Sequence, residues 1–297
     1  MTEHKKTYTF GWVHEYPDFR DYSPQHPKIV PLLNKLNMVP ATKKKLPDSV
    51  DLRDCCSPVE DQKNIGSCTA NAGVGLVEYF ERRASGQHID ASRLFLYKTT
   101  RNLLCWEGDC GAYIRTTMGA MVLFGLPPEK YWPYTDKPGG EPDGFNREPP
   151  AFLYAFGASY KPILYYKMDL PGIQKPKVLE TIKMHIAGNF PSMFGFTVYS
   201  SLGQGRETGM IPYPTPKDTV LGGHAVMAVG YDNHIKIENI ESGDATTGAL
   251  LIKNSWGTTW GEKGYGWLPY DYVLKGLAVD WWTIIKQSYV DTGVFGF

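Results

Sequence analysis

The spacing of apolar residues changes once along this chain, and that change limits the folds it can adopt. A turn-rich stretch at 127–150 contains seven prolines and marks a boundary. Before it, the spacing predicts three helices, over 68–83, 93–102 and 114–124. After it, shorter periods predict three strands, over 191–198, 224–231 and 249–253. The sequence therefore predicts an α+β fold with a helical half, about 46–150, and a mainly β half, about 151–285, followed by a tail, 286–297.

The composition describes a folded protein without a strong electrostatic preference for a partner. Of 297 residues, 42% are hydrophobic and 21% are charged, which is enough to form a sizeable core. The 31 basic and 31 acidic residues cancel, so we expect neither a nucleic-acid nor a membrane partner, and we expect a monomer. The first residues hold no apolar core of signal-peptide length, which predicts a cytoplasmic protein unless another export route is used.

Residues 1–45 form a distinct segment, called the N-terminal arm below. It carries eight Lys or Arg residues, four Asp or Glu residues and five prolines, and it ends in Lys43-Lys44-Lys45. A short helix is expected at 31–36. Two interpretations remain open: a pro-segment that partly covers a cleft, or an extension that only packs on the body.

Cys68 is the first candidate for chemistry, because it follows Gly66-Ser67 and opens the first predicted helix. The positive end of a helix dipole and its free N–H groups favour a thiolate over a thiol. A thiolate is a strong nucleophile, and a neighbouring imidazolium would stabilise it further. This position therefore predicts a reactive cysteine.

Three other residues have neighbouring sequences that suit a role beside a thiol nucleophile. His224 follows two glycines and opens an apolar strand, where its imidazole can face a cleft. Asn254, before Ser255-Trp256-Gly257, can hold the second imidazole nitrogen. Gln62 precedes the cysteine in the same loop region, where its amide can donate to an oxyanion.

These segments together resemble the papain-like cysteine peptidases. The resemblance covers about residues 46–285 and rests on motifs that occur in the family's order. They are Asp51-Leu52-Arg53, Pro58-Val59-Glu60-Asp61-Gln62, Gly66-Ser67-Cys68, Gly223-His224-Ala225-Val226, and Lys253-Asn254-Ser255-Trp256-Gly257. The spacings 224 − 68 = 156 and 254 − 68 = 186 exceed the family's usual ~130–150, which indicates insertions in the β half.

The resemblance implies a fold, a reaction and a role for each residue. The fold would have two lobes, one helical and one β-barrel-like, with the active-site cleft between them. Cys68 would be the nucleophile, His224 the general base and acid that pairs with the thiolate, and Asn254 the group that orients His224. Gln62 and the Cys68 N–H would form the oxyanion hole, and Trp256 would shield the His224–Asn254 bond. The partner would be a peptide or protein substrate, and neither a metal nor an organic cofactor is implied.

Substrate-binding residues follow from the same resemblance. The segment 107–113 resembles the glycine-rich loop that pairs with an extended substrate, and Gly111 would let the two chains approach closely. The residues expected to contact substrate are Gly111, Ala112, Tyr113, Phe194, Gly223, Ala225 and Trp256.

The chain departs from the family pattern at the cysteines and in the arm. Ile65 stands where the family has a cysteine that forms a disulfide, and Thr69 stands where it has a tryptophan. We expect the other cysteines, Cys55, Cys56, Cys105 and Cys110, to be reduced, although a pair such as Cys56 with Cys105 or Cys110 stays open. The arm lacks the family's inhibitory helical motif and resembles the short lead segments of bacterial and viral relatives, which predicts a zymogen of that kind.

Three functions remain at this point. The leading hypothesis is a thiol endopeptidase that works through a Cys68 thioester. The second is a peptidase fold that binds peptides without cutting them. The third is the same thiol chemistry used for acyl transfer or amide release on a non-peptide substrate.

Overall fold

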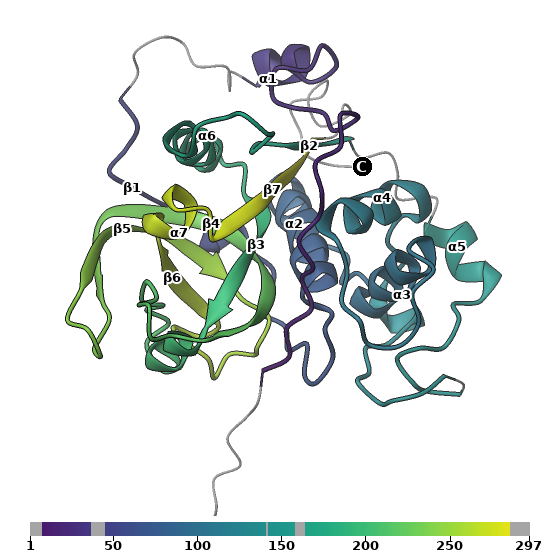
Figure 1. The fold of residues 1–297 in the computed structure, drawn as a ribbon. Helices are drawn as coiled ribbons and strands as arrows, with labels where there is room; N and C mark the ends of the chain where they lie inside the picture. The colour runs from purple at the N-terminus through teal and green to yellow at the C-terminus, as the bar shows by residue number, and fades with distance from the viewer. Residues whose placement is uncertain (1–7, 37–44, 141, 158–163, 286–297) are drawn as a thin grey trace, which may run out of the picture.

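The computed structural model describes residues 8–36, 45–140, 142–157 and 164–285. The helices of residues 68–157 gather on one side of the molecule and an antiparallel sheet on the other, and the N-terminal arm runs between them (Figure 1). The structure thus combines a group of helices with a sheet, as the predicted α+β fold requires.

The helical half consists of α2 (Cys68–Ser85), α3 (Arg93–Leu103), α4 (Ile114–Phe124) and α5 (Ala151–Gly157). The helix α2 ends at Gly86, whose φ of 75° is a left-handed conformation that glycine adopts without strain. The helix α3 starts after Ser92, whose Oγ accepts a hydrogen bond from Phe95 N at 3.1 Å. The three predicted helices are confirmed. The short α5 packs against α4 through Tyr154 and Phe124, with ring centroids 5.3 Å apart.

The β half is one antiparallel sheet with the strand order β2-β7-β3-β4-β5-β6, and β1 pairs with β4. Its strands are β1 (Ser49–Asp51), β2 (Leu164–Lys167), β3 (Ser192–Tyr199), β4 (Val220–Glu238), β5 (Ala245–Lys253), β6 (Tyr265–Pro269) and β7 (Ala278–Ile285). The strand predicted at 191–198 overlaps β3, and those predicted at 224–231 and 249–253 lie within β4 and β5. The strand β7 was not predicted, because almost all its residues are buried and it shows no alternation of polar and apolar residues.

The other elements of the described residues are three helices and three 3-10 turns. The arm contains α1 (Val30–Lys35), close to the predicted helix. The β half also contains α6 (Lys175–Ala187) and α7 (Tyr270–Leu274). The helix α6 was not predicted, although Val178, Ile182 and Ile186 recur at the helical spacing of four and are buried. Three 3-10 turns are η1 (Arg53–Cys55), η2 (Glu129–Tyr131) and η4 (Ser200–Gly205). Within the described ranges, every helix is too short or too polar to cross a bilayer.

The helix α2 is the element on which both halves meet. A Cβ at Gly75 would lie 2.8 Å from Met227 Sδ of β4, so the backbone of α2 approaches the sheet closely. A Cβ at Gly73 would lie 3.3 Å from Leu96 of α3, on the helical side. Because α2 is wedged between the two halves, its first residue, Cys68, is held where they join.

Candidate active site

Cys68 begins α2 and its side chain is completely buried. Burial raises the pKa of the Cys68 thiol to about 11, because a thiolate is poorly solvated in the interior. Backbone hydrogen bonds from Ala225 and Gly11 act in the opposite direction. One of these two donors is on β4 and the other is in the arm, so the sulfur lies between the sheet and the arm.

His224 lies on β4 and is held by two neighbours. Its Nε2 lies 2.8 Å from Asn254 Oδ1, and the Ser255 N–H donates to the same oxygen at 2.8 Å. The Trp256 indole stacks on the imidazole with ring centroids 4.4 Å apart and planes 20° from parallel. Burial lowers the pKa of His224 to about 4, which the bond to Asn254 only partly offsets. Its Nδ1 has no hydrogen-bond partner in the described chain.

Gln62 reaches the same site from the loop before α2. Its Oε1 accepts from Ser255 Oγ at 2.7 Å, which fixes the direction of the amide. Its Nε2 donates to Ile65 O and to Thr9 O, both at 3.0 Å. Since Ser255 links Gln62 to Asn254, and Asn254 links to His224, the amides and the imidazole form one connected group beside Cys68.

The arrangement brings together a buried thiol, an imidazole bonded to one side-chain amide, and a second side-chain amide. Burial beneath the arm acts against the imidazolium–thiolate pair expected from the sequence, because it raises the pKa of the thiol and lowers the pKa of the imidazole. The physical reason is that the arm excludes water from both groups.

The arm occupies the cleft through backbone pairing. Ala112 N donates to Gly11 O at 2.8 Å, and Val13 N donates to Ala112 O at 3.1 Å. On the opposite wall, Trp12 N donates to Gly223 O at 2.9 Å. Gly111 has a φ of 72°, and a Cβ there would lie 2.1 Å from Gly11 O. The arm therefore pairs with both halves, and only glycine suits the point of closest approach.

The residues expected to bind substrate divide into two groups. Those at the arm are Gly111, Ala112 and Gly223, which border its backbone, Ala225, which bonds Cys68, and Trp256, whose ring stacks on Tyr8 at 4.2 Å. Phe194 instead is fully buried and stacks on Trp281 at 3.8 Å. Tyr113 packs on Trp106 with centroids 5.1 Å apart.

Two residues of the site were not singled out from the sequence. Gly195 lies opposite the arm, where its Cβ would be 2.0 Å from the Trp12 ring. Because alternate residues of a strand face opposite sides, Gly195 faces the arm while Phe194 faces the core. A glycine between two phenylalanines within a strand was the available signal for a close approach. Ser255, which aligns Gln62, gave no signal of its own.

The remaining cysteines take no part in this site. All five cysteines are free thiols, so neither Cys56 nor Cys110 is in a disulfide. In the part of the chain that the structure describes, no group of three or more His, Cys, Asp or Glu side chains could hold a metal ion.

Comparisons with known proteins identify the family of this chain. Residues 46–273 match the family described as papain family cysteine protease. An uncharacterized peptidase C1-like protein of Acanthamoeba polyphaga mimivirus is 31% identical, over 93% of this chain and 86% of its own length. Thiol protease aleurain of Arabidopsis thaliana is 29% identical over 80% of this chain, which spans 60% of that protein.

Among solved structures, xylellain, a cysteine protease from Xylella fastidiosa, superimposes with a TM-score of 0.73 and 33% identity, covering 93% of this chain and 95% of that one. The predicted papain-like α+β fold and the resemblance to bacterial and viral members are therefore confirmed. The chain belongs to the papain family of cysteine proteases.

Proposed function

We propose that this protein hydrolyses peptide bonds through a thioester on Cys68. The observation that carries the proposal is the bond between His224 Nε2 and Asn254 Oδ1 at 2.8 Å, beside a cysteine at a helix N-terminus. This bond directs the other imidazole nitrogen, Nδ1, away from Asn254, and Nδ1 has no partner among the described residues. An unpaired basic nitrogen next to a thiol is what general-base activation requires.

The proposed reaction has two stages: Cys68 is first acylated, and the thioester is then hydrolysed. His224 takes the Cys68 proton, and the sulfur attacks the peptide carbonyl carbon to give a tetrahedral oxyanion. The Gln62 side-chain amide and the Cys68 backbone N–H donate to that oxygen. Collapse breaks the C–N bond, and His224 returns the proton to the leaving amine. Water then attacks the thioester with His224 as base, which releases the acid and restores the thiol.

We further propose that the arm inhibits this reaction by filling the cleft. Thr9 O accepts from Gln62 Nε2, so the arm uses the donor assigned to the oxyanion. The Gly11 N–H acts on the Cys68 thiol and lowers its pKa, and Phe10 lies edge-on to His224 with centroids 6.2 Å apart. A substrate cannot bind where the arm does, so release of the arm would have to precede catalysis.

The test is intact-mass spectrometry of the full chain treated with an epoxysuccinyl thiol-peptidase inhibitor. The proposal predicts one adduct, mapped to Cys68, and turnover of a fluorogenic peptide that Cys68→Ala and His224→Ala both abolish. A Cys68→Ala protein that still cleaves peptides would refute the assignment. Slow labelling that accelerates after residues 1–45 are trimmed supports the inhibitory arm, and equal rates before and after trimming contradict it.

A further inference from the structure

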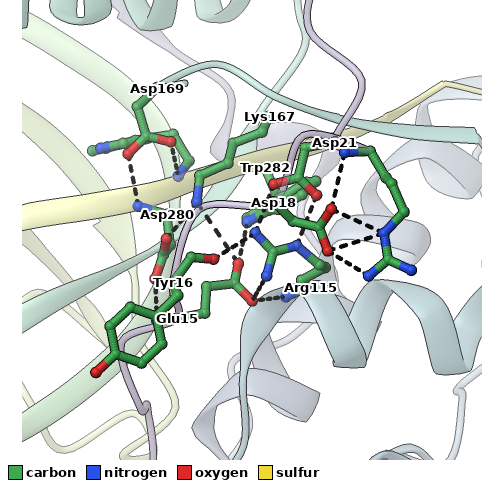
Figure 2. A network of polar contacts seen from close by, with 11 residues as sticks. Glu15, Tyr16, Asp18, Asp21, Arg115, Lys167, Asp169, Asp280 and Trp282 are labelled. Carbon is green, nitrogen blue, oxygen red and sulfur yellow. Dashed lines mark hydrogen bonds and ion pairs between the residues drawn. The ribbon is translucent and has the colours of Figure 1, made fainter. Parts of the chain in front are cut away.

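Beyond the cleft, the arm inserts a carboxylate into the body of the protein. Glu15 is only 3% exposed and lies among α4, β2 and β7 (Figure 2). Its Oε2 accepts from Arg115 N at 3.3 Å and lies 3.2 Å from Arg115 Nη1. Its Oε1 accepts from the Trp282 indole at 3.2 Å and lies 3.8 Å from Lys167 Nζ. We call the set of Arg115, Lys167 and Trp282 the Glu15 receptor.

The cations of the Glu15 receptor already have closer acidic partners. Lys167 Nζ lies 2.6 Å from Asp280 Oδ1, and Arg115 Nη2 lies 2.6 Å from Asp21 Oδ2. The Glu15 N–H itself faces Asp280 Oδ2 at 3.5 Å. Two cations are therefore shared among three carboxylates, and Asp169 lies close enough to Lys167 to act on it as a fourth. An ionised Glu15 would add a negative charge to a cluster whose two cations are already matched by Asp280 and Asp21.

A buried carboxyl group with incomplete charge compensation is more stable when protonated. Burial raises the pKa of Glu15 to about 7, and Asp280 and Asp21 act in the same direction. Arg115 and Lys167 oppose the rise without cancelling it. A neutral carboxyl group still accepts hydrogen bonds from Trp282 and Arg115, so protonation removes the charge and keeps those contacts.

We propose that the Glu15 receptor is a binding site for a protonated carboxyl side chain, which holds the arm over the cleft in acid and releases it as Glu15 ionises. This inference rests on the proposed function only in taking the arm as the inhibitor of the cleft. The three elements of the receptor belong to the body, and Glu15 belongs to the arm, so the contact forms only when the arm is docked.

The direction of the pH effect follows from linkage. In the released arm Glu15 meets water and has the ordinary pKa of 4.5, whereas in the docked arm its pKa is about 7. At a pH between these two pKa values, docking of the arm therefore takes up a proton. Below the lower pKa value, the contribution of Glu15 to docking is fully present. The docking equilibrium weakens as the pH rises through 7, by a factor of about 300 if the whole shift is lost on release. Asp169, whose pKa burial raises to about 6, stays in the body in both states.

Hydrogen exchange of the docked arm tests this proposal without relying on peptidase activity. Full-length Cys68→Ala protein would be compared with the same chain carrying Glu15→Gln or Glu15→Ala. The reporters are the amides of Trp12 and Val13, which donate to Gly223 and Ala112. Amides within α2 report whether each variant is folded. Because the background is inactive, a failed peptidase assignment leaves this measurement interpretable.

We expect protection of the reporter amides, corrected for intrinsic exchange, to fall about 150-fold from pH 4.5 to pH 8 in the Glu15 protein, which is half of the full factor because a released Glu15 is already half ionised at pH 4.5. Glu15→Gln is neutral at every pH and should stay protected at pH 8. Glu15→Ala should be weakly protected at both pH values. The matched control is Asp18→Asn, because Asp18 binds Arg20 within the arm and is not part of the receptor; its profile should follow that of the unchanged arm.

Three outcomes would overturn the proposal. One is protection that does not change between pH 4.5 and pH 8 while Glu15 is present. Another is a fall of the same size in Glu15→Gln, which would assign the pH dependence to a different group. Full protection in a folded Glu15→Ala variant would show that the receptor does not hold the arm.

Discussion

At the scale of single residues, the direction of one amide is decided by its neighbours. Gln62 Oε1 accepts from Ser255 Oγ at 2.7 Å, so the Nε2 end must point the other way, toward Ile65 O and Thr9 O. The Thr9 carbonyl occupies the position at which we propose a substrate oxyanion forms. The arm therefore marks the donor that catalysis would use.

Gln62→Ala should lower kcat by about 10²–10³, because one fixed donor to an oxyanion contributes about 2.7–4 kcal/mol. Turnover of a fluorogenic peptide would be normalised to sites titrated with an epoxysuccinyl inhibitor. Ser255→Ala is the comparison: it keeps the amide but removes the bond that aligns it, so its loss should be smaller. Equal losses for both variants would contradict an oxyanion role for Gln62.

The protonation state of Cys68 gives a second prediction at this scale. Because its pKa is raised to about 11 beneath the arm, the docked protein at pH 5 should contain a neutral thiol. The difference in absorbance at 240 nm between the unchanged protein and Cys68→Ala measures the thiolate. We expect no thiolate signal at pH 5 and a signal once the arm is trimmed. A full signal at pH 5 in the intact chain would mean that the ion pair persists under the arm.

At the scale of elements, the arm fits the cleft because glycines of the body leave room for its backbone and its Trp12 ring. Gly111 and Gly66 allow Gly11 to pass between them, and Gly195 accommodates Trp12. A Cβ at Gly11 would lie 1.8 Å from Gly66 O, a distance that no side-chain adjustment relieves because both atoms belong to the backbone. The arm and the loop before α2 therefore contact each other backbone to backbone, and this contact requires glycine at position 11.

Gly11→Ala should displace the arm from the cleft without altering the body. We expect faster labelling of Cys68 by an epoxysuccinyl inhibitor and higher activity of the full chain at pH 5. Gly203→Ala is the matched control, since a Cβ at Gly203 meets nothing within 4 Å. If Gly11→Ala labels at the rate of the control, the arm is not held at this contact.

At the scale of the whole molecule, α2 joins the two halves and has Cys68 as its first residue. The close approach at Gly75, 2.8 Å from Met227 Sδ, locates the helix against the sheet. On its other side the helix contacts the helical half at Gly73. A larger side chain at either contact of α2 would move the two walls of the cleft relative to each other.

Gly75→Val should lower the free energy of unfolding by about 1–3 kcal/mol, because it overpacks the contact between the halves. Thermal unfolding followed by circular dichroism would measure the change. Gly119→Val on α4 is the control, since a Cβ there has only an ordinary contact, 3.8 Å from Tyr165 Oη. Both variants place valine in a helix, so equal melting temperatures would remove the packing argument.

Local patterns in the sequence were enough to predict the main elements and the candidate catalytic residues. The apolar spacing predicted α2, α3 and α4, and strands within β3, β4 and β5, because these elements bury a regular face. The elements that were not predicted include β7, which is buried on both sides and shows no alternation of polar and apolar residues. Cys68, His224, Asn254 and Gln62 stood out because each has an unusual local frame, and the structure connects them through Ser255 and Ala225.

The sequence alone thus determined the fold class, the family and the set of groups available for chemistry. Only the tertiary structure decided the protonation of these groups and their exposure to solvent, because both depend on burial among segments far apart in the chain. Glu15 meets Asp280 across 265 positions, and Gln62 meets Thr9 across 53. Those contacts exclude water, and the loss of water shifts the pKa values of Glu15, Cys68 and His224. No local pattern records such a loss, because it arises only when the arm lies between the two halves.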